Sequence, residues 1–195
     1  MVNTHIVETE SGHHMIDAQF LRALGAEVRA FAGSLGKPIR QRDLFHADPD
    51  HLLGASQFAD VPFITSDDVL ADAQQSEEMY RGRKAQFSDE TPLVLPAGGF
   101  ALGTQDWDGV SVMVDQVADA EASHTLTVHI LEAGLAIVQN LLDANAHALP
   151  LGKAGNWIAA LKDVAALEGL RVLGAGHGLP AAPGAVEDAI ASLTF

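Results

Sequence analysis

Apolar residues recur at helical spacing in two long stretches of this chain. Residues 19–35 carry them at intervals of three and four, at Phe20, Leu21, Leu24, Val28, Phe31 and Leu35. This periodicity predicts an amphipathic helix that ends at Gly36 and Pro38. The second such helix is predicted over 155–170, with Trp157, Ile158, Leu161, Val164 and Leu167 facing inward. Further helices are expected from Ser66, which suits an N-cap, to residue 84, and over 183–195.

Strand patterns occupy much of the remaining chain. The predicted segments are 4–20 (two short strands around a turn at Ser11–Gly12), 38–45, 61–65, 91–117 (a meander), 124–140 (a hairpin that turns near Ala133–Gly134) and 171–180 (a strand that runs into a glycine loop). Strands and helices are mixed in one half of the chain and then again in the other. This order predicts two packed sheets with helices outside them, in one domain over residues 1–195.

Composition narrows the class of protein. The chain is 48% hydrophobic, which is enough for a core, and its formal net charge of −15 argues against nucleic acid and against anionic membranes as partners. No apolar run is long enough for a membrane span, and the first residues do not read as a secretion signal, so we expect a cytoplasmic protein. The chain has no cysteine. Any metal must therefore be bound by imidazole, carboxylate, amide or water.

Histidines at the ends of predicted strands are the informative residues. Three candidate sites are the segment His46–His51, then His124, then His177. In the first, "FHADPDH", Asp48 suits an N-cap and Pro49 the first helical position, and the positive helix N-terminus favours carboxylate or metal-bound hydroxide nearby. Short His/Asp runs also form caps and hydrogen-bonded turns without a metal, so this segment alone leaves both interpretations open.

Five elements in order carry a resemblance to a known family. They are "NTHIVETESGHHMIDAQF", "FHADPDH", "SHTLTVHILEAG", "LAIVQN" and "GAGHGLP". With them the chain resembles the metallo-β-lactamase superfamily over nearly its whole length. The resemblance implies an α+β fold, a four-layer αβ/βα sandwich with a metal cleft at the edge of its two sheets. It also implies one or two divalent metal ions (Zn, Fe or Mn) that activate water for hydrolysis.

The resemblance assigns candidate roles to single residues. His46 and His124 match ligands of a first metal; Asp50, His51 and His177 match ligands of a second. Asp50 would also orient or deprotonate the attacking water. Asp17 matches an aspartate that can support a ligating histidine, although a hydrogen-bonded turn also explains it. His147 falls where the family places substrate-pocket residues, and a surface histidine explains it equally.

Two positions depart from the family pattern. Asp48 stands where the second motif histidine belongs, and Asn140 stands where the family has the aspartate that bridges both metals. The number of carboxylates in the candidate ligand set is unchanged. His46, Asp48 and His124 form one set of two histidines and a carboxylate; Asp50, His51 and His177 form another. Such sets suit Fe(II) or Mn(II) at least as well as zinc.

Three functions remain open from the sequence. The first is a metal-dependent hydrolase of a small ester, thioester or lactone. The second is a non-haem iron protein, flavodiiron-like or dioxygenase-like. The third is a metal-free relative that keeps only the fold. The expected partner is a small-molecule substrate, and neither nucleic acid nor membrane. A homodimer is a further option if Trp107 and Phe100 are exposed, but core packing explains both residues equally well.

Overall fold

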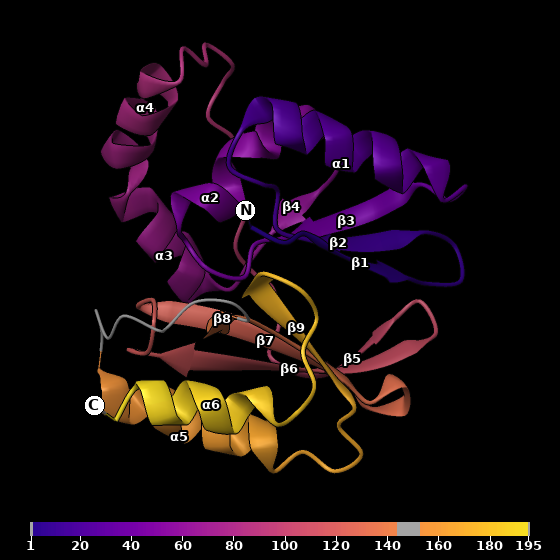
Figure 1. The fold of residues 1–195 in the computed structure, drawn as a ribbon. Helices are drawn as coiled ribbons and strands as arrows, with labels where there is room; N and C mark the ends of the chain where they lie inside the picture. The colour runs from indigo at the N-terminus through magenta and orange to yellow at the C-terminus, as the bar shows by residue number, and fades with distance from the viewer. Residues whose placement is uncertain (1, 144–152, 195) are drawn as a thin grey trace. The chain divides into compact units, whose positions relative to one another are not determined.

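The computed structural model describes residues 2–143 and 153–194, which fold into two compact units (Figure 1). The N-terminal unit comprises Val2–Phe100, and the C-terminal unit comprises the described residues from Ala101 onward. The single domain over 1–195 stays a prediction. Within the described residues, no helix combines the length and the apolar content that a membrane crossing requires.

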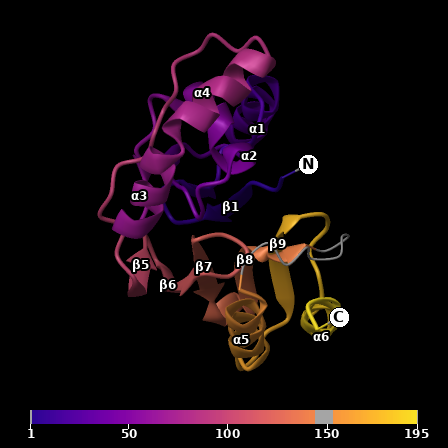
Figure 2. The same ribbon diagram turned by 90° about the vertical axis from the view of Figure 1, so that its left-hand side faces the viewer.

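The N-terminal unit is built on a four-stranded sheet. Its strands are β1 (His5–Glu8), β2 (His13–Ile16), β3 (Ile39–Asp43) and β4 (Phe63–Ile64), in that order. β1 and β2 form the predicted antiparallel hairpin, whereas β2, β3 and β4 are parallel. The helices are α1 (Arg22–Ser34), α2 (Pro49–Leu52), the 3-10 helix η1 (Leu53–Phe58), α3 (Asp67–Gln75) and α4 (Glu77–Gln86). The helix predicted over 66–84 is therefore interrupted at Ser76, and its two parts follow one another along the unit (Figure 2).

Helix α1 forms where its periodicity predicts, but it buries less of its apolar side than the pattern suggests. Phe31 is 60% exposed and Leu35 is 41% exposed, while Gly25 and Ala32 are the buried residues of the helix. The reason is that α1 approaches η1 closely at Gly25, where an added Cβ would lie 2.9 Å from the Gly54 carbonyl oxygen. Small residues anchor the helix, and the large apolar residues near its C-terminus stay uncovered.

The C-terminal unit is built on a five-stranded sheet. Its strands are β5 (Gly103–Trp107), β6 (Val110–Ala118), β7 (His124–Ile130), β8 (Leu135–Asp143) and β9 (Val172–His177), in that order. β5 to β8 form an antiparallel meander that includes the predicted hairpin, and β9 runs parallel to β8. The turn between β7 and β8 contains the short 3-10 helix η2 (Leu131–Ala133) and Gly134 in the left-handed conformation, with φ 59°.

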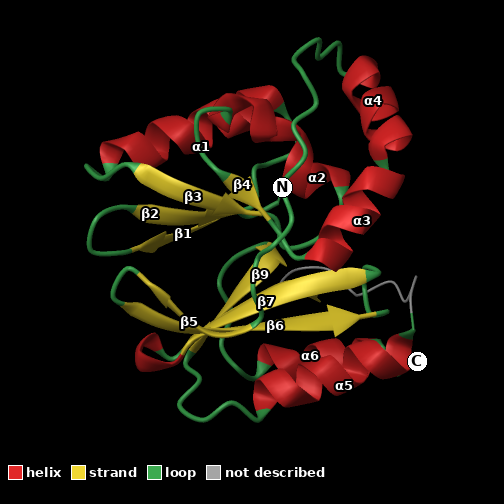
Figure 3. Ribbon diagram, turned by 180° about the vertical axis from the view of Figure 1, so that it is seen from behind, coloured by secondary structure: helices red, strands yellow, loops and turns green. Residues whose placement is uncertain are grey.

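Two helices cover one face of this sheet, α5 (Ala154–Ala165) and α6 (Ala185–Ser192) (Figure 3). Trp157 and Leu161 of α5 are buried against β8 and β9, together with Val138 and Leu173. The indole Nε1 of Trp157 donates a hydrogen bond of 2.9 Å to the Leu141 carbonyl, which fixes the helix on the sheet. The inward side predicted for this helix is confirmed at these positions.

The two aromatic residues considered for a dimer interface are not exposed. Trp107 is 3% exposed and Phe100 is 6% exposed. Of the two interpretations that the sequence left open for Trp107 and Phe100, exposure at an interface is therefore wrong and core packing is correct, because both side chains are buried. A homodimer stays a prediction without support from these residues.

Candidate metal centre

The segment His46–His51 leads from the end of β3 into α2. Asp48 is the N-cap residue of α2 and Pro49 is at its first helical position, as the sequence predicts. The Asp48 side chain accepts no capping hydrogen bond from the helix. Because the Asp48 carboxylate does not cap the helix, its oxygen atoms can serve as metal ligands.

His46 and His51 of the N-terminal unit lie against each other. Their ring centroids are 3.9 Å apart and both side chains are fully buried. Among the described residues, neither ring nitrogen of His46 has a hydrogen-bond partner. Burial, helped by His51, lowers the pKa of His46 to about 4. At neutral pH this imidazole is uncharged and keeps a lone pair, which is the form that binds a metal ion.

Each of these histidines faces a carboxylate from its own segment. His46 Nε2 is 3.9 Å from Asp48 Oδ2, and His51 Nε2 is 3.7 Å from Asp50 Oδ2. Both distances are too long for hydrogen bonds. The two carboxylates are partly exposed, whereas the two rings are not. Two histidine–carboxylate pairs thus lie side by side, with the imidazoles inward.

Asp17 supports this pair of rings from the end of β2. It has φ 65°, a left-handed conformation that aspartate tolerates better than most residues, and it is fully buried. One carboxylate oxygen accepts a hydrogen bond of 3.0 Å from the Phe45 amide, and the other lies 2.6 Å from His51 Nδ1. Burial raises the pKa of Asp17 to about 7. A proton held between Asp17 and Nδ1 leaves Nε2 of His51 as the donor atom for a metal.

Tyr80 of α4 contacts the segment His46–His51. The sequence analysis did not predict this residue. The side chain is fully buried, and its hydroxyl donates a hydrogen bond to the carbonyl oxygen of Ala47. Burial raises the pKa of Tyr80 to about 12, so the hydroxyl keeps its proton. The only signal in the sequence was a single tyrosine within a strongly charged helix. Nothing local linked it to a residue 33 positions earlier.

Replacing Tyr80 with phenylalanine should loosen this segment. The variant keeps the ring but leaves the Ala47 carbonyl without its donor, which costs about 0.5–1.5 kcal/mol of unfolding free energy in urea. Metal affinity should fall several-fold, because His46 and Asp48 flank Ala47. Thr9→Val, which removes a 2.8 Å hydroxyl–carbonyl bond to Gly12, is the control and should lower stability without lowering metal affinity. Equal metal affinity in both variants would refute the positioning role of Tyr80.

In the C-terminal unit, the remaining candidate ligands gather at one end of the sheet. His124 is the first residue of β7, His177 is the last residue of β9, and Asn140 is near the end of β8. Because β7 runs antiparallel to β8 and β9 runs parallel to β8, these three positions lie at the same end of the sheet. The Asn140 Oδ1 atom is buried without a hydrogen-bond partner among the described residues.

Gly176 and Glu121 fix how Asn140 lies. A Cβ at Gly176 would overlap Asn140 Oδ1, so the glycine before His177 makes room for this amide. Asn140 Nδ2 donates a hydrogen bond of 3.5 Å to Glu121 Oε1. The aspartate that the family pattern has at this position could not make this contact, because an ionised carboxylate has no hydrogen to donate. Sequence reasoning missed Glu121; the only sign was an acidic residue three positions before His124.

The groups match the donor chemistry of a divalent metal. They offer buried imidazole nitrogens, carboxylates and a neutral amide oxygen, which are the ligands expected in a chain without cysteine. One potential ligand atom from each of Asp17, His46 and His51 lies within 4.8 Å of the others. The two groups of candidate ligands belong to different units. His147 lies outside the described residues.

Comparisons with known proteins identify the fold. No family model and no curated protein matches the sequence. Solved structures do match, across 98% of the chain. A metallo-β-lactamase from Pontibacter korlensis matches with 18% identity and a TM-score of 0.77 over 86% of its length. A metallo-β-lactamase from Hirschia baltica matches with 19% identity and a TM-score of 0.77 over 85% of its length. The chain has the metallo-β-lactamase fold. The metallo-β-lactamase FIM-1 from Pseudomonas aeruginosa, in its mono-zinc form, matches with 15% identity and a TM-score of 0.78 over 83% of its length.

The metallo-β-lactamase fold confirms the predicted class, two mixed sheets with flanking helices. In this fold, the buried His/Asp cluster around His46 and His51 is consistent with a metal site. At identities below 20% the comparison establishes the fold and leaves the substrate open.

Proposed function

We propose that this protein is a metal-dependent hydrolase of a small ester, thioester or lactone. The observation that carries the proposal is the pair of buried, side-by-side imidazoles, each facing a carboxylate, with Asp17 behind one of them. The two buried ring nitrogens of His46 have no hydrogen-bond partner among the described residues, which is costly in a structural core, and a metal ion would satisfy one of them. A bound divalent ion lowers the pKa of its water toward neutrality and supplies the hydroxide for hydrolysis.

The chain's own residues have separable roles in this proposal. His46 and His51 hold the metal, and Asp17 fixes the tautomer of His51 through the 2.6 Å contact at Nδ1. Asp50, whose carboxylate is 29% exposed, accepts the proton of the attacking water. Asp48 completes the donors of the N-terminal unit. His124, Asn140 and His177 are the proposed ligands from the C-terminal unit.

The proposed metal is harder than zinc. In the ligand sets predicted from the sequence, Asp48 adds a carboxylate, while Asn140 offers a neutral oxygen in place of a bridging carboxylate. Two histidines with one carboxylate and open positions suit Fe(II) or Mn(II) at least as well as Zn(II). Zinc stays among the metals to test, since the similar FIM-1 structure is a mono-zinc form. The same ligand sets support the second candidate function, a non-haem iron protein.

The proposal is tested by elemental analysis of protein purified without added metal, followed by a screen of esters, thioesters and lactones. We expect about one or two equivalents of iron or manganese, with hydrolysis that a chelator removes and the metal restores. Oxygen uptake with iron and no hydrolysis would favour the second candidate. Stoichiometric zinc in both sites would overturn the choice of metal. Absence of metal binding at saturating Zn, Fe and Mn would refute the hydrolase and favour a metal-free relative that keeps only the fold.

A further inference from the structure

A largely exposed leucine follows the candidate ligand His177 in the C-terminal unit. Leu179 is 75% exposed, more than any other large apolar side chain among the described residues. It lies two positions after His177, and two residues span at most about 7 Å of chain. Single exposed apolar residues are common on protein surfaces and by themselves indicate no function. The backbone that carries Leu179, and its place in the sheet, distinguish it from such residues.

The loop that carries Leu179 is held at both ends. Gly178 has φ 84°, a left-handed conformation that glycine adopts without strain, so the chain turns directly after β9. Pro180 favours an extended backbone at Leu179. Ala181 and Leu173 then exchange two backbone hydrogen bonds, of 2.8 and 2.9 Å, which tie the returning chain to β9. A fixed backbone therefore presents the leucine, and a ligand that contacts it need not order the loop first.

This loop leaves the sheet at the end where the candidate ligands of the C-terminal unit gather. His177 is the last residue of β9, and His124 and Asn140 lie at the same end of β7 and β8. Leu131, which is 58% exposed, follows the last residue of β7 and so lies at the opposite end of the sheet. An apolar group bound beside these candidate ligands would therefore meet Leu179 and not Leu131.

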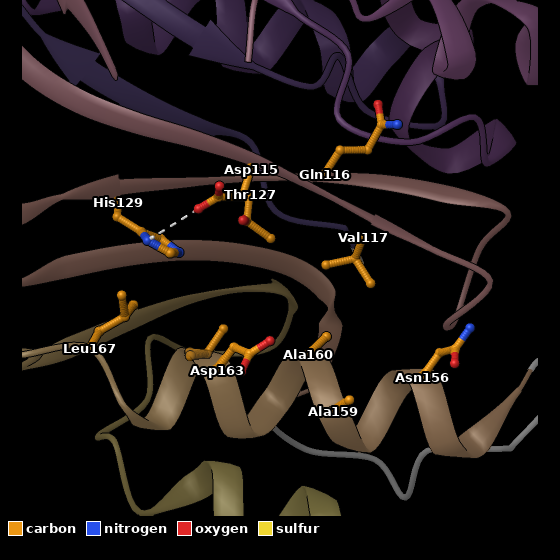
Figure 4. Close-up of a pocket in the computed structure, with 11 residues that line it drawn as sticks. Asp115, Gln116, Val117, Thr127, His129, Asn156, Ala159, Ala160, Asp163 and Leu167 are labelled. Carbon is orange, nitrogen blue, oxygen red and sulfur yellow. Dashed lines mark ion pairs between the residues drawn. The ribbon is translucent and has the colours of Figure 1, made fainter. Parts of the chain in front are cut away.

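The groove beside α5 offers a different surface. It has a volume of about 520 Å³ and lies between α5 and the strands β6 and β7 (Figure 4). Asp115 on the strand side and Asp163 on the helix side give each wall a carboxylate. An apolar chain bound there would take these carboxylates out of water, which is costly. Leu179 and Pro180 carry no charge, so the loop after β9 suits an apolar chain better.

We propose that Leu179 is a specificity-determining residue that contacts an apolar acyl chain of the substrate. The inference rests on the proposed hydrolase and narrows its substrates to esters or thioesters with an unbranched acyl chain. A chain of about six carbons is long enough to extend from the neighbourhood of His177 to Leu179. Full burial of a methylene group is worth about fourfold in affinity, so contact on one side is worth about twofold. Leu179 contacts the chain alike before and during the reaction, so its effect falls mainly on KM.

The test compares the acetate, butyrate and hexanoate esters of p-nitrophenol as substrates of the metal-loaded protein. For the parent, kcat/KM should rise about twofold per methylene group, or about tenfold or more from acetate to hexanoate. Leu179→Ser should lower the hexanoate-to-acetate ratio at least about threefold, mainly through KM, and Leu179→Met should keep most of it. Leu131→Ser, an exposed leucine replaced at the other end of the sheet, is the matched control and should keep the parent's ratio.

A binding measurement distinguishes failure of this inference from failure of the proposed function. Hexanoate, the product acid, is titrated calorimetrically into the parent and into Leu179→Ser, with acetate as the reference, and Leu179→Ser should bind hexanoate at least about threefold more weakly. Such weakening without hydrolysis of any ester would support the apolar contact and refute the hydrolase. Hydrolysis with the same ester ratio in the parent and in Leu179→Ser, or equal losses in Leu131→Ser, would overturn the role of Leu179 and leave the hydrolase standing. Neither hydrolysis nor hexanoate binding would refute both.

Discussion

Replacing His46 with leucine is expected to abolish metal binding while making the metal-free protein slightly more stable. His46 is fully buried, and neither of its ring nitrogens has a hydrogen-bond partner among the described residues. Leucine has a similar volume and no polar atom, so it removes the cost of two desolvated nitrogens without opening a large cavity. We expect the free energy of unfolding to rise by about 1 kcal/mol in the presence of a chelator.

The effect on the metal should have the opposite sign and be much larger. Loss of a residue that only supports a ligand typically costs about 10–100-fold in metal affinity, so loss of a ligand should cost at least about 100-fold. Elemental analysis and metal titration measure this change, and urea unfolding measures stability. The opposing signs are diagnostic, because a histidine kept for structure would lose stability when replaced.

His13→Leu is the matched control for this experiment. His13 of β2 is also fully buried, and both of its ring nitrogens also lack a hydrogen-bond partner among the described residues. The control should gain similar stability and bind metal as the parent does. Retained metal binding in His46→Leu would exclude His46 as a ligand. Loss of binding in both variants would show a general disturbance and not a ligand effect.

Local patterns predicted the elements well because their signals are local. The hairpins over 4–20 and 124–140 combine alternating apolar residues with turn residues, and both appear in the structure. The helix over 155–170 likewise follows from its period. Periodicity, however, reports which side of a helix is apolar and not whether another element covers it. Phe31 of α1 and Leu35, its C-cap residue, are therefore more exposed than their spacing indicates.

The candidate site was predictable only where a motif marks it. The segment His46–His51 and the strand-end positions of His124 and His177 follow from residue type and order. The contacts that hold them do not, because they join residues distant in sequence: Asp17 with His51, and Tyr80 with Ala47. Asp17 was singled out by resemblance alone. Tyr80 and Glu121 carry no motif, so only the folded chain reveals them.

Gly54→Ala is expected to lower both the stability of the protein and its affinity for metal. A Cβ at Gly54 would overlap the Ala18 carbonyl oxygen and lie 3.0 Å from the Gln19 carbonyl oxygen. These are backbone atoms, so no side-chain rotation relieves the contact. The same backbone is held by hydrogen bonds from the Gly54 amide to Gln19 and from the Ala18 amide to the His51 carbonyl, at 2.8 and 2.7 Å.

The added methyl group must therefore separate η1 from the segment that follows Asp17. Overpacking of this kind costs about 1–3 kcal/mol of unfolding free energy. Because Asp17 precedes the displaced backbone directly, its contact with His51 should lengthen and metal affinity should fall about 10–100-fold. Urea unfolding with a chelator and metal titration measure the two effects separately.

Gly82→Ala supplies the matched control for Gly54→Ala. Gly82 lies within α4, and a Cβ there would meet nothing within 4 Å. Alanine is the better helix former, so this variant should gain about 0.5–1 kcal/mol and keep its metal affinity. If Gly54→Ala lost stability but bound metal as tightly as Gly82→Ala, the position of Asp17 would not govern the donor atom of His51. Joint loss of both properties in Gly54→Ala alone would connect the close packing of η1 to the metal site.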